Sequence, residues 1–119
     1  MNKLSALILL AWLPAAAQPA VKVEGRADFC RSVLQGAAFN RYLEKNCGFK
    51  GRVSAKAARI FETQCRGQLD KKRAAALEKE AEKAGAVRFK RYGKRDFCRA
   101  NRRGYEDAGE VLGKMAAGG

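Results

Sequence analysis

Four cysteines follow an N-terminal segment that has the layout of a secretory signal peptide. Residues 1–17 carry one charge, Lys3, then an apolar run over Leu4–Leu13, and end in Ala15–Ala17. A short apolar core followed by small residues is typical of a signal peptide, and it is shorter than the about 20 residues that span a bilayer. We therefore expect cleavage before Gln18 and an exported protein, periplasmic or secreted, whose cysteines form disulfides.

The mature chain is expected to be all-α, a small disulfide-linked bundle of four helices. Ala, Lys, Arg, Glu and Leu dominate, strand-like alternation is nearly absent, and Pro19 is the one proline after the signal. These residue types favour helix. The mature chain of about 100 residues is long enough for one compact domain. We expect a flexible N-terminal segment over 18–27, a helical domain over 28–115 and a flexible tail over 116–119.

Capping residues and glycines divide the domain into the four expected helices. Asp and Ser favour helix starts because their side chains accept hydrogen bonds from free backbone N–H groups, and Gly favours helix ends. The expected starts are Asp28, Ser54, Asp70 and Asp96, and the expected stops are Gly48, Gly67 and Gly85. A three-helix alternative joins the second and third helices into one, from Ser54 to Ala84.

The spacing of the cysteines selects one of three pairings. Cys30 and Cys47 lie on one expected helix, about 25 Å apart by helical rise, so they cannot bond to each other. In an up-down bundle of four helices, the start of helix one lies beside the end of helix two. The end of helix one lies beside the start of helix four. We therefore predict Cys30–Cys65 and Cys47–Cys98, each stabilising the fold by about 4 kcal/mol through loop closure. Cys30–Cys98 with Cys47–Cys65 suits the three-helix alternative only in part, because it leaves Cys47 near the turn and Cys65 about 16 Å up the second helix.

The side chains available for chemistry argue against an enzyme. The chain has no histidine, and pairing of the cysteines removes the thiol nucleophile and the thiolate metal ligand. No spacing of Asp, Glu, Lys or Tyr marks a catalytic site. We predict no catalytic residues, no metal and no cofactor.

The net charge points instead to anionic partners. The whole chain carries +13, and the mature form keeps +12 once Lys3 is removed. Such a charge attracts nucleic acid, lipid head groups and acidic proteins, and it does not choose among them. The partner is therefore expected to be an anionic macromolecule or acidic protein, and a membrane surface is an alternative.

Basic residues are concentrated where two expected loops, 48–53 and 85–95, meet near Cys47 and Cys98. Cations interleaved with aromatic rings suit phosphate backbones and stacked bases, and equally anionic lipid head groups. Phe49 and Phe89 are expected within this cluster. We call the predicted binding residues the basic pole: Lys50, Arg52, Arg88, Lys90, Arg91, Lys94, Arg95 and Tyr92.

Two other patterns have structural interpretations. The charged run over 70–83 mixes signs and is expected to be a solvated helix face without a site. The sequence Asp28-Phe29-Cys30-Arg31 recurs as Asp96-Phe97-Cys98-Arg99. We interpret this repeat as a helix start, an apolar contact and a disulfide cysteine in each end helix.

Three functional hypotheses follow, in order. The first is a small exported basic helical binding protein that engages nucleic acid, lipopolysaccharide or an acidic protein through the basic pole. The second is a periplasmic inhibitor, immunity factor or chaperone-like factor that binds a protein in a groove between helices. The third is a cationic membrane-active effector, which would need a contiguous apolar face as well as charge.

Overall fold

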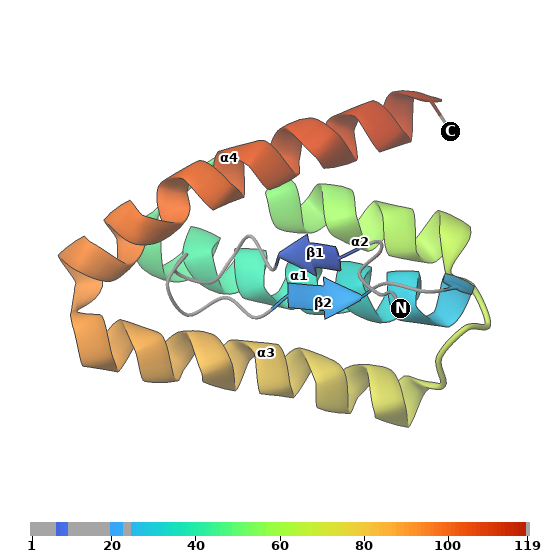
Figure 1. The fold of residues 1–119 in the computed structure, drawn as a ribbon, viewed down its shortest axis with the longest axis horizontal. Coiled ribbons are helices and arrows are strands. Elements are labelled where there is room, and N and C mark those ends of the chain that lie inside the picture. The colour runs from blue at the N-terminus through green and yellow to red at the C-terminus, as the bar shows by residue number, and fades with distance from the viewer. Residues whose placement is uncertain (1–6, 10–19, 23–24, 119) are drawn as a thin grey trace.

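The protein folds into four helices joined by short connections (Figure 1). The structure is a computed structural model that describes residues 7–9, 20–22 and 25–118. Its helices are α1 (Gly25–Cys47), α2 (Val53–Gln64), α3 (Lys71–Tyr92) and α4 (Lys94–Gly118). The four-helix prediction is confirmed. The three-helix alternative is wrong, because the chain leaves helical geometry between Gln64 and Lys71.

Two three-residue strands precede the helices. β1 (Leu7–Leu9) and β2 (Ala20–Lys22) pair antiparallel, with Ile8 opposite Val21. β1 lies inside the predicted signal peptide, and the other residues of 1–17 lie outside the described part of the chain. Cleavage before Gln18 would remove β1, so this pairing concerns only the uncleaved chain. Among the helices that the structure describes, none combines the length and apolarity needed to cross a membrane.

The helices alternate in direction, so their ends meet at two opposite ends of the domain. Figure 1 shows α1 and α3 running one way and α2 and α4 running the other. Contacts join α1 to the three other helices, and α4 also packs against α2 and α3. The ends of α1 and α3 therefore lie at the same end of the domain as the starts of α2 and α4.

The core lies on both sides of α1. One cluster contains Phe39, Leu43, Phe49, Val53, Phe97 and Tyr105. The other joins α1 to α2 through Val33, Ala37, Ala57 and Ile60. The sequence predicts an apolar stripe of Ala58, Phe61 and Cys65 on the second helix; this is wrong at Ala58, which is exposed while its neighbour Ala57 is buried. The helix begins at Val53, and this sets which of its faces is turned toward α1.

The prediction that Gly85 ends the third helix is wrong. Gly85 is buried inside α3, and an added Cβ would lie 3.0 Å from the Tyr42 ring and 3.2 Å from the Phe39 ring. The missing side chain thus lets α3 approach α1 closely. The same helix begins as expected, since the Asp70 carboxylate accepts a hydrogen bond from the Arg73 backbone N–H at 2.8 Å.

Helix ends differ from the expected bounds at both termini of the domain. α1 begins at Gly25, ahead of Asp28, and α4 begins at Lys94 and continues to Gly118. Gly48 follows α1 with a φ of 76°, the left-handed conformation expected after a helix end. The helical part of the chain is therefore slightly longer than 28–115.

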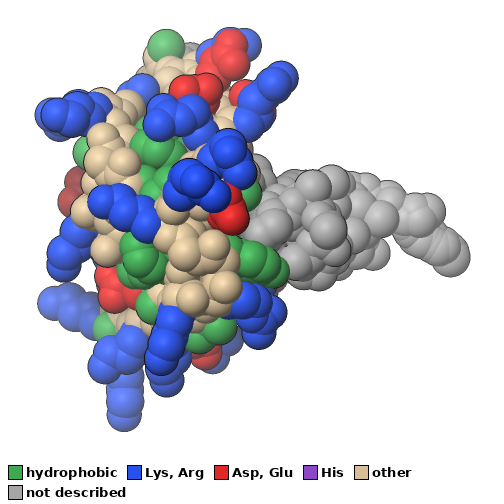
Figure 2. All heavy atoms as spheres, turned by 90° about the vertical axis from the view of Figure 1, so that its left-hand side faces the viewer, with side chains coloured by type: hydrophobic (Ala, Val, Ile, Leu, Met, Phe, Trp, Pro, Cys, Tyr) green, Lys and Arg blue, Asp and Glu red, His purple; other side chains and the backbone are tan. Residues whose placement is uncertain are grey.

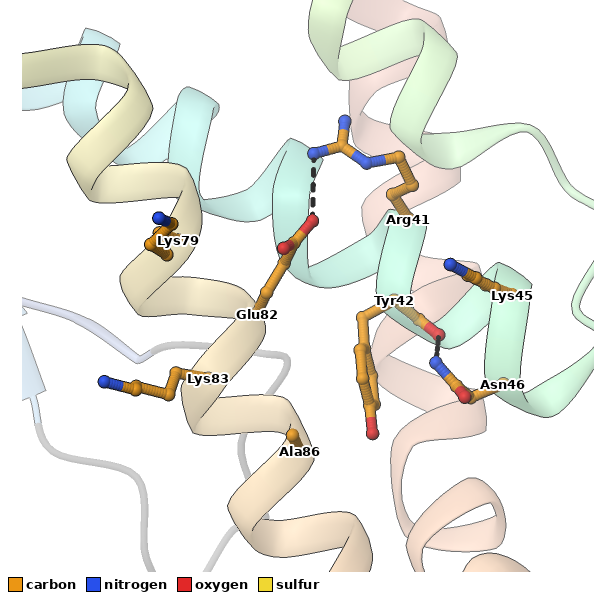
Figure 3. Close-up of a pocket in the computed structure, with 8 residues that line it drawn as sticks. All are labelled: Arg41, Tyr42, Lys45, Asn46, Lys79, Glu82, Lys83 and Ala86. Carbon is orange, nitrogen blue, oxygen red and sulfur yellow. Dashed lines mark hydrogen bonds and ion pairs between the residues drawn. The ribbon is translucent and has the colours of Figure 1, made fainter. Parts of the chain in front are cut away.

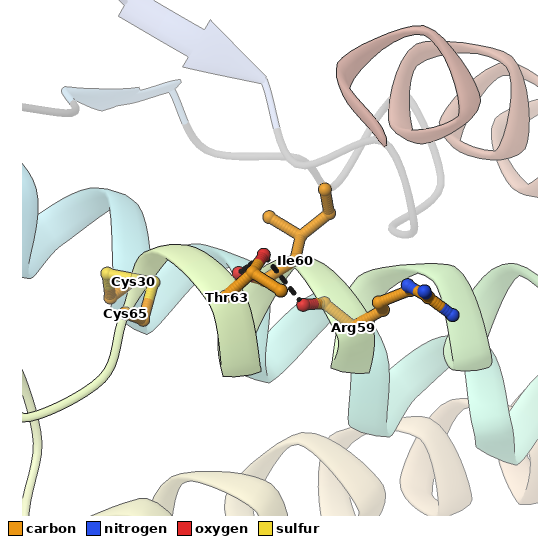
Figure 4. Close-up of a disulfide and its surroundings, with 5 residues drawn as sticks. All are labelled: Cys30, Arg59, Ile60, Thr63 and Cys65. Carbon is orange, nitrogen blue, oxygen red and sulfur yellow. Dashed lines mark hydrogen bonds between the residues drawn. A yellow bond between two sulfur atoms is a disulfide. The ribbon is translucent and has the colours of Figure 1, made fainter. Parts of the chain in front are cut away.

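Both predicted disulfides are confirmed. Cys30–Cys65 joins the start of α1 to the end of α2 (Figure 4), and Cys47–Cys98 joins the end of α1 to the start of α4. Each has a Cα–Cα distance of 5.6 Å, and no cysteine is left free. Two such bridges indicate that the protein matures in an oxidising, extracellular environment.

The two disulfides should differ in their resistance to reduction. Cys30 and Cys65 are 0% and 1% exposed, whereas Cys47 and Cys98 are both half-buried. Attack by a thiolate needs access to sulfur, so under native conditions Cys47–Cys98 should be reduced first. Graded reduction, alkylation and peptide mapping would measure this order. Earlier or simultaneous alkylation of Cys30 and Cys65 would contradict it.

Candidate anion-binding surface

The basic residues expected on the loop 85–95 lie on helices instead. α3 continues through Tyr92, and Gly93, with a φ of 83°, alone separates it from α4. Arg88, Lys90 and Arg91 therefore occupy the last turns of α3, which are favourable positions for cations because the helix dipole is negative there. The prediction of a loop was wrong because it assumed that Gly85 ends the helix.

The basic pole nevertheless gathers at one end of the domain. Lys50 and Arg52 lie in the connection between α1 and α2, and Lys94 and Arg95 lie in the first turn of α4. The Cys47–Cys98 disulfide fixes the end of α1 beside the start of α4. Figure 2 looks onto this end and shows Lys and Arg side chains around the face, with apolar side chains visible between them.

Most of these cations are exposed. Lys50, Arg52, Lys90, Arg91 and Lys94 are exposed and have no ion-pair partner in the described part of the chain. Two others are partly engaged. Arg95 lies 3.6 Å from the Asp96 carboxylate, and the half-buried Arg88 guanidinium donates to the Ala84 carbonyl at 3.3 Å. The basic pole therefore has five cations available to a ligand.

The aromatic residues of this end have mainly structural roles. Phe49 is 7% exposed and packs on Tyr105, with ring centroids 4.9 Å apart. Phe89 is half-buried and contacts the Phe97 ring edge-on at 5.4 Å. Tyr92 is 43% exposed, so of the three expected aromatics it is the one open to a ligand.

One cation near this end was not predicted. The Arg102 guanidinium lies over the Phe49 ring, 4.7 Å from its centroid. This cation–π contact covers Phe49 and adds positive charge on α4 beside the basic pole. Arg102 follows Cys98 by one helical turn, so the spacing in the sequence places it on the same helix face as the disulfide cysteine.

One partly buried carboxylate, Glu44, joins three helices near the basic pole. The Glu44 carboxylate on α1 accepts hydrogen bonds from the Ser54 backbone N–H at 3.1 Å, from the Ser54 hydroxyl, and from the Tyr105 hydroxyl of α4 at 2.7 Å. The Val53 N–H donates to the Tyr105 oxygen at 3.5 Å. These bonds satisfy N–H groups in the first turn of α2.

The prediction that Ser54 caps the second helix is therefore wrong. The residue at the N-cap position is Arg52, whose φ of 55° is left-handed and whose side chain makes no capping bond. Ser54 lies inside the helix and binds Glu44. A residue distant in sequence supplies the cap, and local patterns do not reveal such a contact.

The same hydrogen bonds shift two pKa values in opposite directions. Burial raises the pKa of Glu44, but the hydrogen bonds from Ser54 and Tyr105 outweigh it, so the pKa lies below its ordinary value. Burial, followed by the hydrogen bond to Glu44, raises the pKa of Tyr105. At neutral pH the pair is a carboxylate bound by a neutral phenol.

Metal-binding side chains are not clustered among the described residues. No group of three or more His, Cys, Asp or Glu in this part of the chain is arranged to hold a metal ion. Comparison with protein-family models, with curated proteins and with solved structures finds no match to this chain. Any functional conclusion must therefore rest on its own surface.

Replacing Glu44 by Gln should destabilise the fold by about 1–3 kcal/mol at neutral pH, because the amide cannot accept all of the hydrogen bonds that the carboxylate accepts. The folded pKa of Glu44 is depressed, so its contribution is fully present above the unfolded pKa and is lost as pH falls through the lower folded value. Urea unfolding of wild type and Glu44→Gln from neutral to acid pH would measure the difference between their free energies of unfolding. This difference should become smaller under acid conditions.

Glu106→Gln is the control for this experiment, because Glu106 is exposed on α4. It should change the free energy of unfolding little at any pH. A pH-independent loss in Glu44→Gln would show that the packing of this side chain matters and its charge does not.

Proposed function

We propose that this protein is a small exported binding protein whose basic pole engages an anionic macromolecule. The observation that carries the proposal is the clustering of exposed cations without ion-pair partners at one end of a rigid, disulfide-linked domain. A positive surface of this kind attracts polyanions and raises their association rate. The protein is not an enzyme in this proposal, and it acts in a periplasm or outside the cell.

The distribution of apolar side chains supports an anionic ligand over insertion into a bilayer. Among the described residues, the large exposed apolar side chains are Val87 and Tyr92 on α3 and Val111 on α4. Membrane entry needs a continuous apolar face along a helix. Three residues on two helices provide much less than that, while the cations are numerous.

Neutralising the basic pole should weaken binding more than removing equal charge elsewhere. The pole variant is Lys90→Gln with Arg91→Gln and Lys94→Gln, all exposed side chains. The probes are a fluorescent oligothymidylate, heparin and phosphatidylglycerol vesicles, each titrated at low and at rising salt. We expect affinity for the probe that binds to fall about tenfold or more, with a weaker salt dependence.

The matched control variant is Lys71→Gln with Lys72→Gln and Arg73→Gln, at the opposite end of α3. It removes the same charge from exposed side chains and should change affinity less than about twofold if binding is local. Equal losses in the two variants would show that net charge alone attracts the ligand. If no probe binds wild type at low salt, the proposed function is wrong.

A further inference from the structure

A second basic surface lies outside the basic pole, in a groove between α1 and α3 (Figure 3). The groove has a volume of about 500 Å³. Its lining includes five charged side chains and one tyrosine: Arg41, Tyr42 and Lys45 from α1, and Lys79, Glu82 and Lys83 from α3. The sequence prediction of a solvated face over 70–83 did not anticipate that two of its lysines face α1 across a groove.

The charges of this groove do not cancel. The Arg41 guanidinium reaches across to the Glu82 carboxylate at 3.4 Å, and each side chain is about half exposed. This pair neutralises the one acid of the groove. Lys45, Lys79 and Lys83 are exposed and have no ion-pair partner among the described residues. Three positive charges therefore remain on its two walls.

The groove leads toward the basic pole. Arg41 and Lys45 are four residues apart on α1, and Lys79 and Lys83 are four apart on α3, so each pair lies along one face of its helix. The two helices run in the same direction and end at the basic pole. From Lys79 to Tyr92 the helical rise gives a path of about 20 Å. A ligand bound at the pole can continue along this path only if it is an extended chain.

We infer that the groove and the basic pole together bind a single-stranded nucleic acid, with its phosphates on the lysines. The inference rests on the proposed function and extends its site. A cationic groove lined by aromatic rings is the usual design for single strands. Tyr42 lines the groove, and Tyr92 is 43% exposed at the end of α3.

The test uses a groove variant, Lys45→Gln with Lys79→Gln and Lys83→Gln, beside the pole variant and the control variant described above. All three variants remove three positive charges from exposed positions, and circular dichroism establishes that each is folded. The probes are a long oligothymidylate, a short one that can cover only the pole, and an abasic deoxyribose-phosphate chain of the long length. Fluorescence anisotropy gives each affinity over a range of salt.

We expect wild type to bind the long strand more tightly than the short one and the abasic chain. In the groove variant the long strand should lose about tenfold in affinity and about two units of log-log salt slope, since each lost contact to a single strand contributes about 0.7. The affinity for the short strand should change little, so the groove variant should no longer bind the long strand more tightly than the short one. The control variant should still bind the long strand more tightly than the short one.

Other outcomes would distinguish an error in the groove inference from an error in the proposed function. If the groove variant binds all probes like the control variant while the pole variant fails, the groove is not part of the site and the proposed function stands. If the abasic chain binds wild type as well as the long strand does, bases are not recognised, and a sulfated or phosphorylated polymer without bases replaces nucleic acid as the ligand. If no strand binds wild type, the inference on nucleic acid is wrong, and the proposed function stands only if heparin or the vesicles bind.

Discussion

The Cys47–Cys98 disulfide is the constraint on which the arrangement of this molecule depends. It joins the end of α1 to the start of α4 across 51 residues of sequence. Cations clustered at that end repel one another and oppose the compact state, in a chain whose net charge is +13. A covalent link cannot dissociate in response, and closing so long a loop lowers the entropy of the unfolded chain by an amount worth about 4 kcal/mol. Charge can therefore be concentrated where the bridge lies.

The partly buried Glu44 carboxylate is a second link between the helices near that bridge. Glu44 directs its carboxylate inward to Ser54 and Tyr105, and thereby fixes the start of α2 and the middle of α4 against α1. An acid that faced the solvent here would neutralise part of the basic pole. The carboxylate thus links α1, α2 and α4, while most cations of the basic pole stay exposed.

The sequence predicted those features that depend on local chemistry or on chain geometry. The Asp70 cap, the turn at Gly48 and both cysteine pairings follow from capping preference, glycine conformation and helical rise. The errors concern contacts between distant segments. Gly85 resembles a helix stop, yet it is required inside α3 because the Tyr42 ring packs against it. Nothing near Ser54 in the sequence reveals that Glu44 accepts its hydrogen bonds. The groove between α1 and α3 likewise exists only after the helices have packed.

The repeated Asp-Phe-Cys-Arg sequence explains how the two ends of the domain come to be stabilised alike yet differ in surface. In each copy the aspartate lies in the first turn of its helix and forms an ion pair with the arginine, Asp28 with Arg31 and Asp96 with Arg99. Each cysteine then bonds to a residue at or just beyond the end of another helix. The repeat therefore places an acid in the first turn of a helix and links the start of that helix to another helix. Because both ends carry it, the repeat cannot be what makes one end basic. That property comes from the surrounding connections and helix ends, whose cations the fold does not use.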